Sequence, residues 1–142
     1  MQVSSRFTIA LHMLTALAVF QDQMTMSSSI LASSVNVNPV EIRRIMLQLS
    51  DAGFINVKKG RGGITLAKAP EEITLLDVFN AVEALENGEL FHFHEKPNPE
   101  CPVGRNIHSM LDPKLKEIQN SMEETMQRYT LADVVASSEN QL

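Results

Sequence analysis

The sequence lacks the features that mark disulfide-stapled, secreted and membrane-spanning proteins. Its 142 residues include one cysteine, Cys101, so an intrachain disulfide cannot form and nothing argues for secretion. The apolar stretch near the N-terminus, Ile9–Phe20, is interrupted by His12 and is too short to cross a bilayer. The residues Gln2–Arg6 before it make a poor signal peptide, because they are polar and no small-residue cleavage site follows. We expect a cytoplasmic protein with no membrane partner.

Aromatic residues are also scarce, at 5% of the chain, whereas methionine is plentiful with eight residues. Methionine side chains adapt to uneven packing, so this balance suits helix-on-helix cores. A catalytic constellation is missing as well. Cys101 with His94 or His108 could imitate a Cys–His pair, but no third group, oxyanion site or cofactor motif accompanies it. We therefore predict that the protein is not an enzyme and needs no cofactor.

The net charge of −5 at first argues against a nucleic-acid partner, but the charges are unevenly distributed. Residues 1–69 carry seven basic and three acidic side chains, whereas residues 70–142 carry five basic and fourteen acidic ones. Such asymmetry can turn one face of a protein toward phosphate. Chance clustering of solvated charges is the alternative, and charge alone does not decide between the two.

Two short helices joined by a tight turn are expected between residues 27 and 52. One of the serines at 27–29 caps the first helix. Asn38 caps the second, with Pro39 at its first position and Glu41 placed to complete a capping box. Gly53 provides a left-handed C-terminal end.

A β-hairpin follows these helices. Residues 54–58 and 64–67 are two short strand candidates, and the glycine-rich segment 59–63 between them allows a tight tip. A helix, a turn, a helix and then a hairpin is the order of a winged helix. The predicted fold is mainly α with a small β-hairpin wing, a winged helix-turn-helix followed by a long C-terminal dimerisation helix.

Helices are also expected on both sides of this region. Ser4 or Ser5 caps an N-terminal helix to Phe20 that is apolar on nearly every side, so several elements should cover it. A helix over Leu75–Leu85 precedes a loop rich in proline and histidine. A long helix runs from about Asp112 to Tyr129, and a short last helix follows. We divide the chain into a winged helix-turn-helix region (1–70), a linking helix and sensor loop (71–104), and a dimerisation helix with C-terminal tail (105–142).

The long helix carries one narrow apolar seam, with charged residues on its other faces. The seam steps by three or four residues through Leu115, Ile118, Met122, Met126 and Tyr129. A helix about 25–35 Å long reaches beyond a small core and needs a second helix to cover its seam. We predict a homodimer through this seam; folding back over the same subunit is the alternative.

A family resemblance runs nearly from end to end of the chain. It is carried by the serine-led residues 27–32, by residues 45–55, by the wing glycines Gly62 and Gly63, and by residues 73–78 and 130–134. In this order they resemble the Rrf-two-type family of bacterial winged-helix regulators. The resemblance implies a homodimer in which the long helices cross and each first helix packs on the partner. The sequence departs from the family pattern in two places. The wing is about one residue shorter than is usual in the family, and it has Ile64 and Thr65 where an aromatic residue is common. In the loop before the long helix, cluster-binding members carry three cysteines, whereas this sequence has only Cys101.

Candidate contacts with double-stranded DNA lie at the helix starts, on the second helix of the pair and at the hairpin tip. They are Ser28, Ser29, Asn38, Pro39, Val40, Arg43, Arg44, Lys59, Arg61 and Gly62. The guanidinium group of arginine can donate bidentate hydrogen bonds to guanine or to phosphate. The hairpin tip could enter a minor groove or bind phosphate. Solvated surface arginines, a simple tight turn and serines that only cap a helix are the alternatives. The tip is not a nucleotide-binding phosphate loop, because no Gly-Lys-Ser/Thr step follows it.

The loop from Phe91 to Gly104 is the candidate sensor, with Cys101 as a redox-sensing thiol. Proline after Cys101 suits a helix start, and a helix N-terminus lowers the pKa of a thiol. An inert loop cysteine is the alternative. A zinc-type site on His92, His94 and Cys101 has weak support, because only three soft ligands are available. We therefore predict no metal site. An iron–sulfur cluster is not expected on a single thiolate. A small-molecule signal, or a protein-interaction module that does not bind DNA, also remains open.

Overall fold

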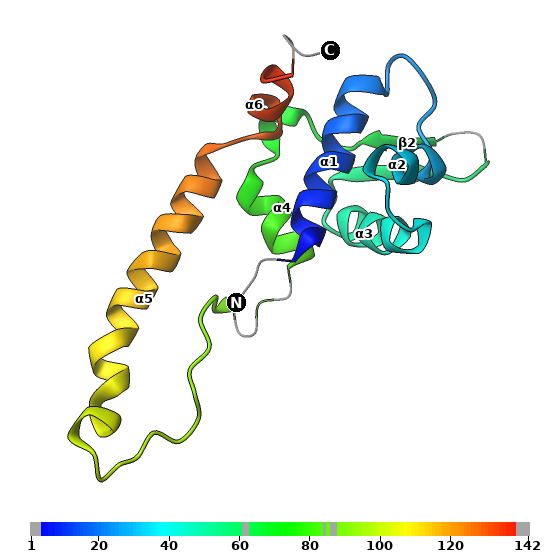
Figure 1. Ribbon diagram of the computed structural model, residues 1–142. Helices are drawn as coiled ribbons and strands as arrows, with labels where there is room; N and C mark the ends of the chain where they lie inside the picture. Colours follow the sequence, from blue (N-terminus) through cyan, green and yellow to red (C-terminus); the bar gives the residue numbers. More distant parts are fainter. Residues whose placement is uncertain (1–3, 61–62, 84, 86–87, 139–142) are drawn as a thin grey trace. The chain divides into compact units, whose positions relative to one another are not determined.

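The computed structural model describes residues 4–60, 63–83, 85 and 88–138, and its elements follow the predicted order (Figure 1). They are α1 (Ser5–Phe20), α2 (Ser28–Val35), α3 (Pro39–Asp51), β1 (Ile55–Lys58), β2 (Gly63–Leu66), the short 3-10 helix η2 (Pro70–Glu72), α4 (Leu75–Val82), α5 (Pro102–Arg128) and α6 (Leu131–Ala136). Contacts divide the chain into a first unit, residues 1–83 with 127–142, and a second unit, residues 84–126. None of the described helices is long and apolar enough to span a membrane.

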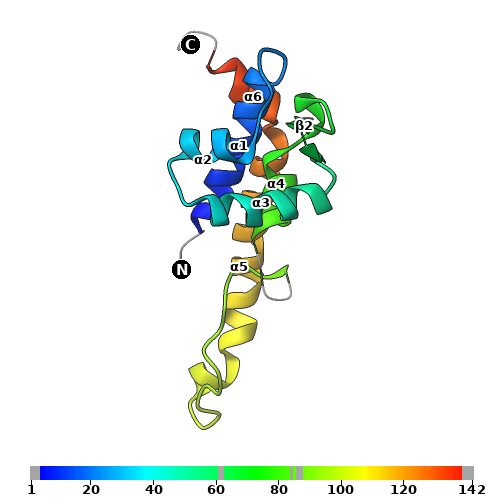
Figure 2. The ribbon, with the colours of Figure 1, turned by 90° about the vertical axis from the view of Figure 1, so that its right-hand side faces the viewer.

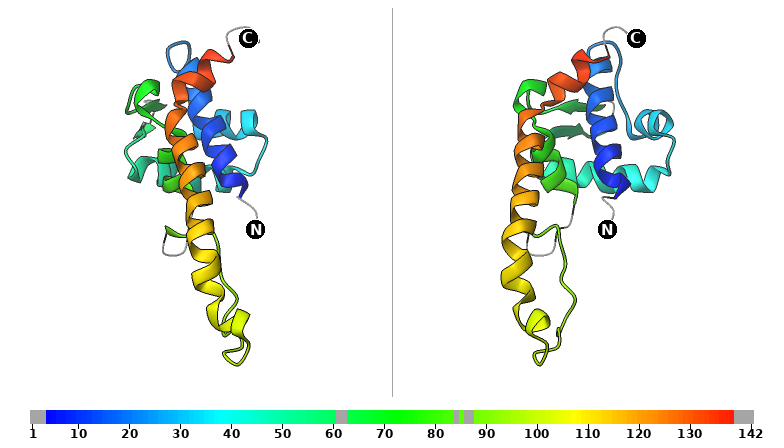
Figure 3. Two further views of the ribbon diagram at one scale, coloured as in Figure 1. Left: turned by 90° about the vertical axis from the view of Figure 1, so that its left-hand side faces the viewer. Right: turned by 60° about the vertical axis from the view of Figure 1, so that its left-hand side comes forward.

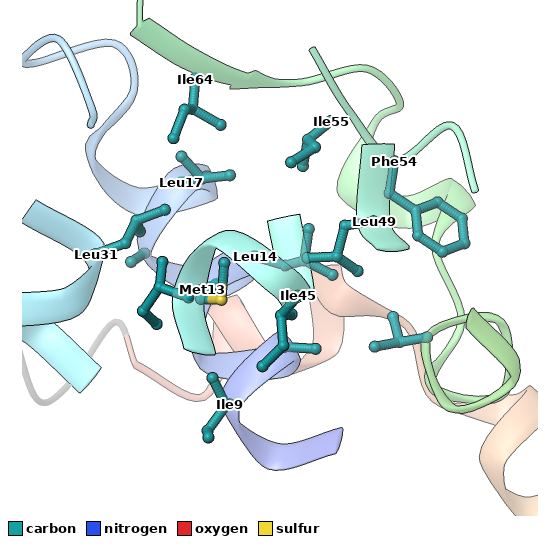
Figure 4. Close-up of a cluster of buried hydrophobic side chains, with 14 of the residues drawn as sticks. Ile9, Met13, Leu14, Leu17, Leu31, Ile45, Leu49, Phe54, Ile55 and Ile64 are labelled. Carbon is teal, nitrogen blue, oxygen red and sulfur yellow. The ribbon is translucent and has the colours of Figure 1, made fainter. Parts of the chain in front are cut away.

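Helix α1 is the centre of the first unit. It contacts α2, α3 and β2, and also α4 and α6, so it is covered on several sides as predicted (Figure 2). Figure 4 shows its side chains converging with those of α2, α3 and the hairpin; the fully buried members include Met13, Leu14, Leu31, Ile45 and Leu49. Removing one such side chain from water contributes about 1.5–3 kcal/mol. This core fixes the positions of the helix-turn-helix and the wing.

Local capping sets the ends of α2 and α3. Ser27 Oγ accepts the N–H of Ile30 at 3.2 Å, and Asn38 Oδ1 accepts the N–H of Val40 at 2.8 Å. Between the helices Asn36 takes a left-handed conformation with φ 62°, which makes the turn tight. Gly53 ends α3 with φ +82°, as its sequence position predicted.

The wing is fastened to the loop between α1 and α2. Its strands pair antiparallel, with Ile55 opposite Leu66 and Lys58 opposite Gly63. The Ile64 N–H donates to the Met26 carbonyl at 3.0 Å, and the Leu66 N–H donates to Gln21 Oε1 at 2.9 Å. These bonds use the outer edge of β2 and hold the hairpin against the helical core.

Two capping boxes lie side by side where α4 and α6 begin. Thr74 with Asp77, and Thr130 with Asp133, each exchange a side-chain and a backbone hydrogen bond. The starts of the two helices are joined by a short antiparallel bridge, in which the Leu131 N–H donates to the Ile73 carbonyl at 2.8 Å. Figure 3 shows α6 beside the C-terminal end of α1, with which it is in contact.

Two predicted helix boundaries were wrong. The long helix begins at Pro102 rather than near Asp112, so the sensor loop ends at Cys101 and Pro113 lies inside the helix. Proline suits the first position of a helix, so either Pro102 or Pro113 could mark the start of the long helix. Helix α4 ends at Val82 rather than Leu85, because Glu83 is extended and its side chain accepts a hydrogen bond from Ser4 Oγ at 2.6 Å.

Candidate nucleic-acid interface

Helix α3 has one buried and one exposed face. Ile42, Ile45 and Leu49 are fully buried, which turns the predicted DNA-contacting side chains of Arg43 and Arg44 into solvent. Exposed apolar side chains accompany the arginines: Val40 is 46% exposed and Leu47 is 67% exposed. The helix lies toward the viewer in Figure 2. The buried residues are three and four positions apart, as one buried face of a helix requires.

The arginine pair has no acidic partner in the described part of the chain. Among the residues that the structure describes, no carboxylate forms an ion pair with Arg43 or Arg44. Glu41 is the acidic residue in the first turn of α3, and no other acidic residue follows until Asp51. The exposed face between these two residues is therefore positively charged and open to an anionic partner.

The polar residues at the helix starts have mixed roles. Ser27, rather than Ser28 or Ser29, caps α2; Ser29 is exposed and Ser28 is half-buried. The side-chain oxygen of Asn38 is used in its cap, next to exposed Pro39. The start of each helix nevertheless presents backbone N–H groups that favour an anion.

The wing tip is only partly described. Lys59 is exposed and follows β1 directly. Arg61 and Gly62 lie outside the described residues, so their predicted roles have no structural account. Lys68, beyond β2, lies with its Nζ atom 5.4 Å from the centre of the Phe54 ring. The ammonium group of Lys68 is therefore close to a side chain of the same subunit.

Cys101 stands at the N-terminus of α5, as the proline after it indicated. Its carbonyl accepts the Arg105 N–H at 2.8 Å, and its exposed thiol faces the N–H groups of Val103 and Gly104. Hydrogen bonds from the Gly104 and then the Val103 N–H lower the pKa of the Cys101 thiol below its ordinary value. Asn98 forms the turn before it, since its carbonyl accepts the Cys101 N–H at 3.2 Å.

An open groove of about 800 Å³ lies in the second unit. His108 stands in it with its ring centre 4.3 Å from that of Phe93 and its Nδ1 atom 3.4 Å from Asp112 Oδ1. Gln119, which the sequence analysis did not single out, fastens the loop to α5: its Nε2 donates to the Gly88 carbonyl and its Oε1 accepts the Leu90 N–H. His92 lines the groove, but the residues that the structure describes hold no set of three His, Cys, Asp or Glu side chains placed for a metal ion.

The predicted seam of α5 remains accessible to solvent. No residue of α5, all of which is described, is buried. Leu115, Met122 and Met126 are partly exposed, and Ile118 and Tyr129 are 53% and 54% exposed. The dimer stays a prediction, and this exposed row is the surface that it would cover.

Comparison with known proteins gives a consistent family assignment. Residues 3–137 match the Rrf2 family model, described as an iron-dependent transcriptional regulator. YwnA of Bacillus subtilis, named as a helix-turn-helix-type transcriptional regulator, is 41% identical over 133 residues, covering 94% of this chain and 96% of that protein. The regulator NsrR of Halalkalibacterium halodurans is 30% identical over 144 residues, covering 98% and 93%. The structure of T. potens IscR, 21% identical, superposes with a TM-score of 0.75 over 100% of this chain and 92% of that one.

The iron dependence in the family description does not fit the donor set of this chain. Iron–sulfur clusters are held by several thiolates, and this sequence has one cysteine. The described side chains bring no second or third ligand to it. The relatives are transcriptional regulators and not enzymes, and the predicted winged-helix fold is confirmed. By sequence and by structure, this chain belongs to the Rrf2 family of DNA-binding transcriptional regulators.

Proposed function

We propose that the protein is a sequence-specific repressor that binds a palindromic DNA operator as a homodimer. The observation that best supports this proposal is the exposed face of α3, where Arg43 and Arg44 have no acidic partner in the described chain. A helix of this kind is presented to the major groove by the helix before it. Repression follows where the operator overlaps a promoter, since the bound dimer then occupies the site of transcription initiation.

The candidate residues divide between reading bases and positioning the protein. Arg43 and Arg44 contact base edges or phosphates, and Val40 lies between them and the start of α3. The phosphate backbone is held from the helix starts and from the wing by Ser28, Ser29, Asn38, Pro39, Lys59, Arg61 and Gly62. In this proposal the region 1–70 binds DNA, the loop that ends at Cys101 senses the signal, and α5 forms the dimer.

The dimer rests on the length and the exposure of α5. Its 27 residues extend about 40 Å, and its apolar row is not buried within the chain. A second copy of the same helix, related by a two-fold axis, covers this row against an identical one. Two-fold symmetry then places the two α3 helices one or more turns of DNA apart, at about 34 Å or a multiple of it.

Selection of bound fragments from the source genome, combined with sedimentation, tests the proposal. We expect the fragments to converge on an imperfect palindrome and the protein to sediment as a dimer at micromolar concentration. Ile118→Glu, which places a charge in the seam, should give monomers with weakened operator binding, whereas Glu124→Gln should change neither. A wild-type monomer would exclude the dimer, and a dimer without duplex affinity would favour a protein-interaction module.

A thiol switch at Cys101 is the candidate regulatory step, favoured by the position of the thiol at a helix N-terminus. The thiolate sulfur attacks the OH oxygen of a hydroperoxide, an S–O bond forms as the O–O bond breaks, and the departing hydroxide or alkoxide takes a proton from solvent; the products are a sulfenic acid and water or an alcohol. Because Cys101 joins the loop to α5, this change alters the connection between the DNA-binding regions of the two subunits. A small molecule bound in the groove lined by His92 and His108 is the alternative signal.

The thiol proposal predicts both a reactivity and a response. The rate of alkylation of Cys101 by iodoacetamide should reach its midpoint at a lower pH in the folded protein than in urea, because the helix N–H groups stabilise the thiolate. Mild peroxide should release the wild type from its operator, and Cys101→Ser should stay bound. Equal responses of the two proteins would remove Cys101 as the switch and leave the groove as the candidate.

A further inference from the structure

The exposed face of α3 carries apolar side chains in line with its arginines. Val40 and Leu47 are seven residues apart, so they lie on the same side of the helix about 10 Å from one another. Arg43 and Arg44 fall three and four residues after Val40, on either side of the line that joins the two apolar side chains. The face therefore presents an apolar group, a basic pair and a second apolar group in succession.

This arrangement differs from an ordinary solvated helix face. A single exposed leucine needs no special explanation. Here, however, Leu47, the most exposed large apolar residue among those described in the first unit, projects from the same helix face as the arginine pair. The core side of α3 is complete without it, since Ile42, Ile45 and Leu49 are fully buried. Packing within the described chain thus gives no role to Leu47.

We infer that Leu47 and Val40 read the C5-methyl groups of two thymines in the major groove. The inference rests on the proposed function and names part of its specificity. Thymine is the base that offers an apolar group in that groove, and aliphatic side chains contact its methyl. Side chains six or seven residues apart on a helix in the major groove reach bases about two base-pair steps apart, with the arginines over the pair between.

The test removes one methyl group at a time from the DNA. In an operator obtained by selection, each thymine is replaced singly by deoxyuridine, which keeps every hydrogen-bonding group and lacks the methyl. We expect the wild type to bind about three- to fivefold more weakly when the thymine facing Leu47 is changed, the effect of exposing one methyl. A second sensitive thymine should lie about two base pairs away, facing Val40.

Matched variants assign the effect to the side chains. Leu47→Ala should bind the thymine operator more weakly and lose its preference over deoxyuridine at that position only, while Val40→Ala should lose it at the other. Leu47→Met retains an apolar chain of similar size and should keep the preference. Melting temperatures should stay within about 3 °C of the wild type, because these side chains are outside the core.

Two outcomes would overturn the inference. Equal wild-type binding to every deoxyuridine operator would show that no methyl is read. Loss of affinity in Leu47→Ala without any change in thymine preference would assign Leu47 to a different contact. Failure of the wild type to bind any duplex would instead overturn the proposed function, so the two failures are distinguishable.

Discussion

The double variant Arg43→Ala/Arg44→Ala is expected to bind its operator at least about a hundredfold more weakly than the wild type. Each well-placed arginine contact with a base contributes about 1–3 kcal/mol, and a two-fold dimer presents both arginines twice. Both side chains are exposed and lack a carboxylate partner in the described chain, so their removal leaves the core untouched. The melting temperature should therefore stay close to that of the wild type.

Fluorescence anisotropy titrations at several salt concentrations would separate the two arginines. The single variant that removes a base contact should relax specificity at one base pair, and one that removes a phosphate contact should flatten the salt dependence. Lys68→Ala is the control of equal charge for each single variant, since Lys68 lies outside α3 and its Nζ atom stands 5.4 Å from the centre of the Phe54 ring. Wild-type affinity in the double variant would show that α3 is not the reading helix.

Local chemistry made the helix-turn-helix predictable from the sequence. Asn38 followed by Pro39 favours the start of a helix, because asparagine caps the helix and proline suits its first position. Gly53 can adopt the left-handed conformation that ends a helix. The candidate DNA contacts Arg43 and Arg44 were chosen on this helix, and both are exposed. These signals depend on neighbours within four residues, which is why they survive without any knowledge of the tertiary fold.

The start of α5 was placed too late because Pro113 was taken as its first turn. Pro102 and Pro113 both suit a first helical position, but Val103, Ile107 and Leu111 recur every four residues and lead into Leu115, so the apolar period favours the earlier start. The role of Gln119 could not be found in this way, because its two partners, Gly88 and Leu90, are about thirty residues away in sequence.

Gly63 shows a constraint that depends on the tertiary fold. Its position predicted a residue of the tight hairpin tip, but Gly63 is the first residue of β2 and lies against the loop between α1 and α2. A Cβ atom there would stand 2.7 Å from Thr25 Cγ2 and 2.8 Å from the Met26 carbonyl oxygen, both too close. The threonine methyl can rotate away. The carbonyl cannot move freely, because it accepts the Ile64 N–H that fastens the wing.

Gly63→Ala is therefore expected to destabilise the protein by about 2–4 kcal/mol and to lower the melting temperature by about 10 °C or more. Gly60→Ala is the matched control: its φ of +74° is nearly that of Gly63 at +73°, but nothing lies within 4 Å of its added Cβ. It should lose only the left-handed strain, about 1–2 kcal/mol. The difference between the two variants in calorimetry measures the contact of the wing with the Met26 carbonyl. Equal losses would show that backbone conformation alone requires glycine at Gly63, and that the wing can shift against the core without cost.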